Sequence, residues 1–312
     1  MAAMAALRGR DLIADDDLTA AEMLAVLDRA AALKDERRRG VLHDGLLRGK
    51  TIALIFQKPS TRTRVAFEAG IAQLGGQALF LASSELQLGR GETIEDTGRV
   101  LARYVDAIMA RVGRHEEVAA LAGAGVPTIN GLSDLLHPTQ ALADMLTLRE
   151  HLGGWRGRTL AYVGAANNVA HSLLLSGATL GLSVRIACPP GRAPRPEILE
   201  RAGRLAAASG GTVATVHDPR EGVAGADVIY TDVWRSMGDP DGASLADLEP
   251  FRVTPALMAA AGTDPLFMHC LPLLRGQEVA AEVADGPRSI VFDQAENRLH
   301  LHKALLVEQL GG

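Results

Sequence analysis

The chain has 312 residues, of which 47% are hydrophobic and 22% charged, and its formal net charge at pH 7 is -5. This composition excludes a disordered or fibrous protein, and the length favours two domains of about 150 residues each. The weak acidic charge gives no electrostatic footprint for DNA or RNA, so we expect no nucleic-acid partner.

The sequence also argues against a membrane protein and against a metal or disulfide framework. No apolar run reaches the roughly 18 residues that a membrane helix needs. The Ala-rich start carries charge at Arg8, Arg10 and Asp11, too early for the core of a signal peptide. The two cysteines, Cys188 and Cys270, lie far apart without CxxC spacing. We therefore expect a cytoplasmic protein with no membrane partner, no zinc site and no disulfide scaffold.

Helices and short apolar strands alternate in the first half. A capping box at Thr19 and Glu22 begins a helix whose apolar positions recur at helical spacing until a stop at Gly40. Strands are expected at residues 51–56, 107–110 and 126–129. A long helix then runs from Pro138 to Gly153, and we expect it to connect the domains.

The same alternation returns in the second half. Strands are expected at residues 159–163, 184–187, 212–216, 228–231, 266–268 and 290–292. The pattern predicts an α/β fold with two domains, residues 1–150 and 151–312, each a parallel sheet flanked by helices. Because such sheets bind ligands beyond the carboxyl ends of their strands, we expect functional residues directly after the strands.

The densest group of polar residues follows the first strand. It consists of Ser60, Thr61, Arg62, Thr63 and Arg64, at the predicted start of a helix. Helix N–H groups, hydroxyls and guanidinium groups together suit a phosphate dianion. The alternative is a Ser N-cap followed by a solvated basic turn, but a cap requires only one hydroxyl.

A second candidate segment begins at His137. Pro138 suits the first helical position and places His137 at the helix N-terminus, where an imidazole tends to stay neutral. A neutral His137 would donate a hydrogen bond to a carbonyl oxygen, with Thr139 and Gln140 beside it. The alternative is a His-Pro turn in which His137 only caps the helix.

Three strand ends in the second half carry further candidates. Asp232 follows one strand and is well placed to bind a substrate ammonium group, although a plain turn beside a half-buried tryptophan is the alternative. Cys270 follows another strand and is either a site residue or a small buried one. Asn167 and Asn168 stand where a dinucleotide-binding protein has its glycine fingerprint, which is absent. These two amides either bind an amino-acid carboxylate or cap the next helix.

Taken together and in this order, the segments resemble the aspartate and ornithine carbamoyltransferase family over essentially the whole chain. The resemblance implies that family's two-domain α/β fold, with a last helix at about residues 295–312 packing back on the first domain. It implies transfer of the carbamoyl group of carbamoyl phosphate to an amine in a homotrimer, with Gln87 reaching the neighbouring subunit's site. It implies carbamoyl phosphate contacts from Ser60, Thr61, Arg62, Thr63, Gln87, Arg111, His137, Gln140, Cys270, Leu271 and Arg298.

Within the family, the segment at residues 269–272 and the triplet Ser236, Met237 and Gly238 point to ornithine as the acceptor. By resemblance, ornithine is bound by Asn168, Asp232, Ser236 and Met237. Catalytic roles are implied for Arg62, Arg111, His137, Asp232 and Cys270. No cofactor or metal is expected, because the leaving group is already activated.

Two alternatives to this function stay open. The chain departs from the family pattern at Ala165 and Leu274. These departures admit a carbamoyltransferase for another amine, such as putrescine or an acylated ornithine. The other alternative is a non-catalytic member of the fold.

Overall fold

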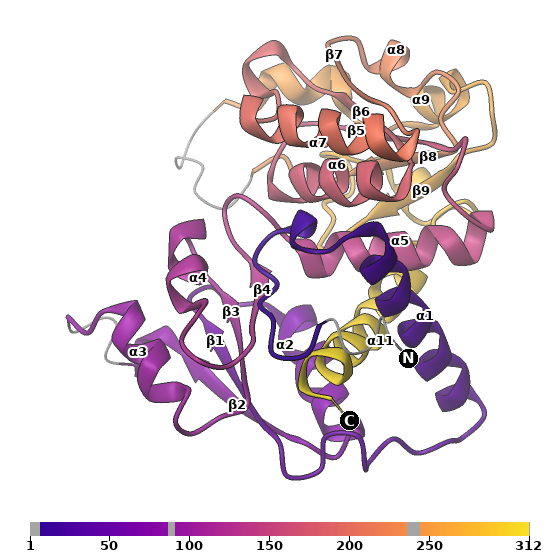
Figure 1. Cartoon of the computed structure of the whole chain (residues 1–312). Coiled ribbons are helices and arrows are strands. Elements are labelled where there is room, and N and C mark those ends of the chain that lie inside the picture. Colours follow the sequence, from indigo (N-terminus) through magenta and orange to yellow (C-terminus); the bar gives the residue numbers. More distant parts are fainter. Residues whose placement is uncertain (1–6, 87–90, 236–243, 312) are drawn as a thin grey trace. The chain divides into compact units, whose positions relative to one another are not determined.

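The computed structural model describes residues 7–86, 91–235 and 244–311 (Figure 1). Its contacts divide the chain into two compact units. The first unit combines Met1–Leu146 with Glu296–Gly312, and the second is Thr147–Ala295. Among the described residues, no helix is long and apolar enough to cross a membrane.

The first unit contains a parallel sheet of four strands in the order β2-β1-β3-β4. The strands are β1 (Thr51–Phe56), β2 (Gln77–Ala82), β3 (Ala107–Arg111) and β4 (Thr128–Leu132). β1 lies inside the sheet, where residues 52–56 are all buried, and this explains its uninterrupted apolar run. β2 was not predicted from the sequence, and it forms an edge of this sheet with only partial burial.

Helices cover both faces of this sheet. Phe67 and Ile71 of α2 share one core cluster with Leu306 and Val307 of α11, against β1 and β3. Residues of α3 and α4 share the cluster on the other face. α1 is tied to α11 by side-chain hydrogen bonds. The bounds are α1 (Ala20–Arg38), α2 (Thr61–Gln73), α3 (Ile94–Leu101), α4 (His115–Leu121) and α11 (Val291–Leu310).

The second unit contains a parallel sheet of five strands in the order β7-β6-β5-β8-β9. Figure 1 shows α6 and α7 on one face, and a core cluster packs α8, α9 and α10 on the strands. The strands are β5 (Thr159–Val163), β6 (Ser183–Ala187), β7 (Val213–Val216), β8 (Val228–Thr231) and β9 (Leu266–His269). The helices of this unit are α6 (Asn168–Leu180), α7 (Pro196–Ser209), α8 (Pro219–Val223), α9 (Pro255–Ala260) and α10 (Ala281–Ala284). Helix α5 (Pro138–Leu152) begins in the first unit and ends in the second. The predicted α/β class, with parallel sheets flanked by helices, is confirmed.

The strand predicted at residues 290–292 was wrong. This segment begins α11, and the chain next to β9 forms only an isolated bridge between Phe267 and Ser289. Ile290 donates one backbone hydrogen bond to Phe267, and the chain then turns into the helix. An apolar triplet is too short to show a period, so the sequence pattern did not distinguish a strand from the first turn of a helix.

Two buried imidazoles, those of His300 and His302, lie on α11. His300 is 2% exposed, and burial, followed by Lys303 and Lys34, lowers its pKa to about 3. Its Nε2 lies 3.5 Å from Glu296 Oε1, but burial and the cations outweigh that attraction. Burial likewise lowers the pKa of His302.

We therefore expect the free energy of unfolding to fall as the pH drops from about 6.5 towards 3. The pKa of His300 in the folded state lies below that of an unfolded histidine, about 6.5. The unfolded chain thus takes up the proton first, so this stabilisation is complete above pH 6.5 and is lost below it. Thermal unfolding midpoints from pH 7 to pH 4 test this, and His300→Gln should flatten the decline. A midpoint independent of pH over this interval would contradict it.

Candidate active-site residues in the two units

The predicted phosphate loop and Arg111 leave the first sheet at neighbouring carboxyl ends. β1 and β3 are adjacent, and Phe56 at the end of β1 is in register with Arg111 at the end of β3. After β1 the chain continues to β2 on one flank, and after β3 it continues to β4 on the opposite flank. The position between β1 and β3 is therefore a topological switch point. Gln57 ties the two loops together, because its N–H donates to Arg111 O (2.9 Å) and its Oε1 accepts from Gly113 N (2.7 Å).

Ser60 caps α2 at this switch point. Its Oγ accepts a hydrogen bond from Thr63 N (3.3 Å), and the helix begins at Thr61. The Ser60 N-cap, which was weighed as the alternative to a phosphate site, is therefore present. The cap does not exclude a phosphate site, because a helix N-terminus concentrates N–H groups and partial positive charge, and Lys58 and Arg62 add full charges beside it.

Arg298 contacts this helix start, and its charge also acts on the predicted residue His137. Arg298 Nη2 of α11 donates to Thr63 Oγ1 (2.7 Å), and both side chains are buried. His137, between β4 and α5, is 4% exposed. Burial, with smaller effects from Arg298 and Arg111, holds the pKa of His137 well below its ordinary value. A pKa held this low favours a neutral His137, and a neutral imidazole can donate a hydrogen bond to a carbonyl oxygen.

Gln140 lies one turn into α5 and is also buried. Its Nε2 donates to Asp144 Oδ1 (2.8 Å) across one turn of the helix. Asp144 therefore holds the carboxamide of Gln140 in one orientation.

A pocket of about 380 Å³ borders the phosphate loop. Loop residues 57–61 form part of its wall, together with the rings of Phe56 and Phe80, whose centroids are 5.3 Å apart. Arg64 forms another part, with its guanidinium carbon 3.6 Å from the Phe80 ring centroid and its Nε 3.0 Å from Glu68 Oε1. Phe80 and Glu68 thus hold Arg64, whereas the resemblance gives the phosphate contact to Arg62.

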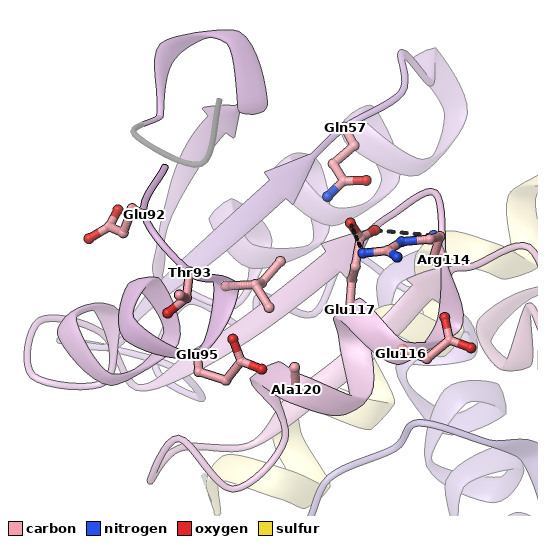
Figure 2. A pocket seen from close by; sticks show the side chains of 9 residues that line it. Gln57, Glu92, Thr93, Glu95, Arg114, Glu116, Glu117 and Ala120 are labelled. Carbon is pink, nitrogen blue, oxygen red and sulfur yellow. Dashed lines mark hydrogen bonds and ion pairs between the residues drawn. The ribbon is translucent and has the colours of Figure 1, made fainter. Parts of the chain in front are cut away.

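A second pocket of about 380 Å³ lies beside α3 and α4 (Figure 2). Its ionisable lining residues are Glu92, Glu95, Arg114, Glu116 and Glu117. Arg114 Nη2 lies 3.5 Å from Glu117 Oε1, so the single cation is paired with one of the four carboxylates. The remaining negative charge opposes binding of a phosphate dianion in this pocket.

The second unit has its own switch point, between β5 and β8. Asn167 follows β5 and caps α6, with its Oδ1 accepting from Val169 N and Ala170 N. Its Nδ2 donates to Asp232 Oδ2 (2.7 Å) beyond the end of β8. Asn167 thus serves both as the predicted cap and as a holder of the Asp232 carboxylate.

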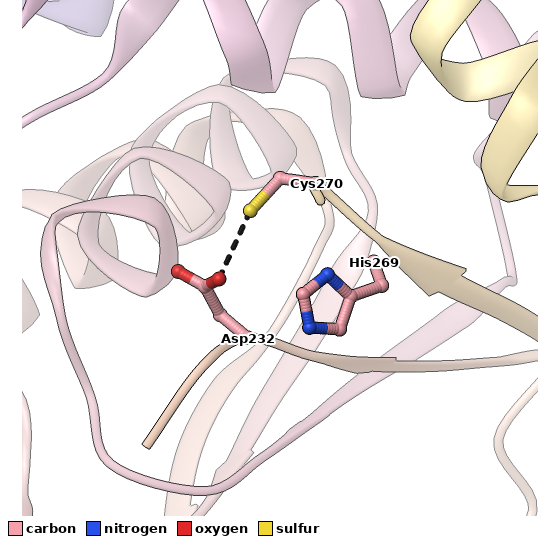
Figure 3. A group of neighbouring side chains, drawn as sticks. All are labelled: Asp232, His269 and Cys270. Atoms are coloured by element: carbon pink, nitrogen blue, oxygen red, sulfur yellow. Dashed lines mark hydrogen bonds between the residues drawn. The ribbon is translucent and has the colours of Figure 1, made fainter. Parts of the chain in front are cut away.

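Cys270 approaches the same carboxylate from β9 (Figure 3). β9 pairs with β8, and Cys270 Sγ donates to Asp232 Oδ1 (3.1 Å). Asp232 is 7% exposed, and its Oδ1 also accepts from Val233 N (2.8 Å). The carboxylate is therefore fixed in position by groups from three strand ends.

His269 completes the group drawn in Figure 3, but its ring serves the next loop. Its Nδ1 accepts from Leu271 N (2.9 Å), and its Nε2 lies 3.3 Å from Glu278 Oε1, with both side chains fully buried. One ligand-type atom from each of Asp232, His269 and Cys270 lies within 4.8 Å of the others. A metal ion here would displace the hydrogen bonds that position this loop.

Several predicted residues need separate mention. Gln87, Ser236 and Met237 lie outside the described residues. Asn168 is in the first turn of α6 and is 9% exposed, and it is Asn167 that contacts Asp232. Leu271 has a positive φ of 61° and is followed by a cis peptide bond to Pro272.

The second cysteine, Cys188, lies away from these residues. It is a free, fully buried thiol, and burial raises its pKa to about 11.

Comparison with known families gives both units a counterpart. Residues 10–150 match the carbamoyl-P binding domain of aspartate/ornithine carbamoyltransferases, and residues 156–308 match the Asp/Orn binding domain. The chain belongs to the aspartate/ornithine carbamoyltransferase family. The resemblance inferred from the motifs is thus confirmed for this carbamoyltransferase family.

Individual relatives in the family are similar over nearly their whole length. The ornithine carbamoyltransferase of Methanothermobacter thermautotrophicus is 57% identical over 277 residues, covering 88% of this chain and 92% of the relative. The anabolic ornithine carbamoyltransferase of Pyrococcus furiosus is 52% identical over 309 residues, covering 98% of each. A solved structure of ornithine carbamoyltransferase from Pyrococcus furiosus superimposes with a TM-score of 0.95, at 52% identity and 98% coverage of both chains. One from Thermus thermophilus gives 0.85, at 43% identity and coverage of 95% and 97%.

Proposed function

We propose that this carbamoyltransferase transfers the carbamoyl group of carbamoyl phosphate to the side-chain amine of L-ornithine, giving L-citrulline and phosphate. The observation that carries the choice of acceptor is the fixed carboxylate of Asp232, which Asn167 and Cys270 hold at the switch point of the second unit. A fixed carboxylate attracts the ammonium group of ornithine, whereas it repels the second carboxylate of aspartate. The names of the similar relatives agree with this acceptor.

The first unit supplies the cations for the leaving group. The amine nitrogen attacks the carbonyl carbon, a C–N bond forms, and the bond from that carbon to the phosphate oxygen breaks. Arg62 and Arg111, with the hydroxyls of Ser60, Thr61 and Thr63, stabilise the departing dianion. Arg111, Arg298 and neutral His137 polarise the carbonyl oxygen, and Gln140 contacts the carbamoyl group.

The acceptor amine must lose a proton before it attacks. Its pKa in water is near that of lysine, about 10.4, so at pH 7 nearly all of it is protonated. Removal from water lowers this pKa. Asp232 and Cys270 orient the amine, which releases this first proton to solvent as it enters the site. After attack the nitrogen loses a second proton, which an oxygen of the departing phosphate takes. These steps require no cofactor.

One assay with four acceptors tests the proposed function. The purified protein is incubated with carbamoyl phosphate in four parallel reactions that contain ornithine, putrescine, acetylornithine or aspartate. The ureido product is measured with a colorimetric assay. Product with ornithine, at a rate well above the other three, is the expected result. A higher rate with putrescine or acetylornithine would show that this amine, and not ornithine, is the acceptor. No product with any amine would favour a non-catalytic member of the fold.

We further propose a cytoplasmic homotrimer in which Gln87 enters the neighbouring subunit's site. Mixed assemblies of Arg62→Ala and Gln87→Ala chains should then recover part of the activity that each variant has lost. Recovery follows because a subunit interface that joins the two intact residues rebuilds one complete site. Co-expression with two affinity tags, followed by assay of the doubly tagged fraction, measures it, and each variant co-expressed with itself is the control. Inactive mixed trimers would exclude shared sites.

A further inference from the structure

Helices α2 and α11 lie in close contact along a seam that begins at the Arg298–Thr63 hydrogen bond. One turn farther along α2, the ring of Phe67 stacks on His302, with centroids 3.8 Å apart and planes inclined by 15°. On the next turn, Gly70 faces α11 so closely that an added Cβ would lie 3.2 Å from Lys303 Cγ and 3.5 Å from Leu299 Cδ1. At the end of α2, Lys303 Nζ donates to Gln73 Oε1 (3.3 Å).

The positions along the seam follow helical geometry. Thr63, Phe67 and Gly70 are spaced by four and three residues, so they share one face of α2. Arg298 and His302 are four residues apart and share one face of α11. The stacked rings are therefore one turn away from the hydrogen bond that joins the two candidate phosphate-site residues.

His302 contacts Phe67 through the face of its imidazole ring. The side chain is fully buried, and neither ring nitrogen forms a hydrogen bond to any group in the described part of the chain. Burial and the nearby Arg298 keep the imidazole neutral by lowering its pKa. A neutral ring stacked on Phe67 holds the two helices together without placing a further cation beside Arg298.

We propose that His302, Phe67 and Gly70 are positioning residues of the carbamoyl phosphate site. They hold α11 at the distance and rotation at which Arg298 reaches Thr63. Gly70 permits the close approach, and the ring stack fixes the two helices one turn from the site. This inference rests on the proposed function, since it requires that Arg298 and Thr63 belong to the site for the first substrate.

The central test is a pair of substitutions at position 302. His302→Ala removes the stack and should raise KM for carbamoyl phosphate by about ten- to a hundredfold, the range expected when a site group is misplaced by up to about 1 Å. KM for ornithine should change little. His302→Phe keeps the stacked ring and should restore KM for carbamoyl phosphate to near the wild-type value. Equal changes in both KM values, or no rescue by phenylalanine, would overturn the proposal.

Two glycine substitutions distinguish a local effect on the seam from a general loss of folding. Gly70→Ala adds a methyl group to the seam, and Gly203→Ala adds one to α7, where nothing lies within 4 Å of the new Cβ. Gly70→Ala should raise KM for carbamoyl phosphate, whereas Gly203→Ala should leave it unchanged. All assays are run well below the measured unfolding midpoint of each variant. Wild-type protein without activity would refute the proposed function, whereas active wild type with unaltered KM in Gly70→Ala and His302→Ala would refute the seam proposal alone.

Discussion

Replacement of Arg62 by alanine is expected to lower kcat by at least about a hundredfold while leaving the fold intact. Arg62 lies in the first turn of α2, beside the Ser60 cap and the switch point where Arg111 leaves β3. In the proposed reaction, the Arg62 guanidinium faces a leaving group that gains negative charge as the C–O bond breaks. Its loss therefore destabilises the transition state more than the bound substrate.

Two companion variants separate the causes of this loss. Arg62→Lys keeps the charge but loses the planar fork, so an activity between that of Arg62→Ala and wild type is expected. Arg99→Ala is the matched control, because Arg99 is an exposed arginine of the same unit whose ion pair with Asp96 is on the surface of α3. Initial rates and thermal unfolding midpoints are measured for all three. Wild-type rates in Arg62→Ala would remove this residue from the phosphate site.

Asp232→Asn should reduce kcat/KM for ornithine by at least about thirtyfold, with little change in KM for carbamoyl phosphate. Asparagine has nearly the same shape, but one carboxylate oxygen becomes an NH2 donor, so the hydrogen bond from Asn167 Nδ2 or that from Val233 N is lost. The negative charge that pairs with the substrate ammonium group is lost as well, and the Asp227→Asn control shares the loss of a carboxylate hydrogen bond. Removal of one partner from a buried, hydrogen-bonded charge pair costs about 2 kcal/mol or more.

The control for this substitution lies at the other end of the same strand. Asp227 precedes β8 and accepts hydrogen bonds from Thr159 N (2.8 Å) and Arg158 Nη1 (2.8 Å). Asp227→Asn also removes a carboxylate from a hydrogen-bonded site, but it should leave both KM values near wild type. If the two variants lose ornithine affinity equally, Asp232 has no specific role in binding the acceptor.

Local patterns in the sequence predicted the elements that depend on neighbouring residues. The Thr19–Glu22 capping box, the start of α2 beside Ser60 and the Pro138 start of α5 each involve residues within four positions of one another. The apolar runs of β1, β5 and β8 are short and continuous because both faces of each strand are buried. The polar residues after these runs followed from the general rule that parallel sheets bind ligands at that edge.

Strand order decided which of those residues meet, and no local pattern encodes it. Asn167 contacts Asp232 because β5 and β8 are neighbours in the sheet, although 65 positions separate the two residues. The edge strand β2 was not predicted, although residues 78–82 form an apolar run.

The sequence by itself determined most of the elements, the strand-end candidates and, through its motifs, the family. Only the tertiary structure decided that Arg298 reaches Thr63, that His302 stacks on Phe67, and that residues 290–292 begin a helix. The physical reason is the distance along the chain over which each signal acts, because caps and periodicity involve residues within one or two turns of a helix. Contacts between α2 and α11 instead depend on how the whole first unit packs.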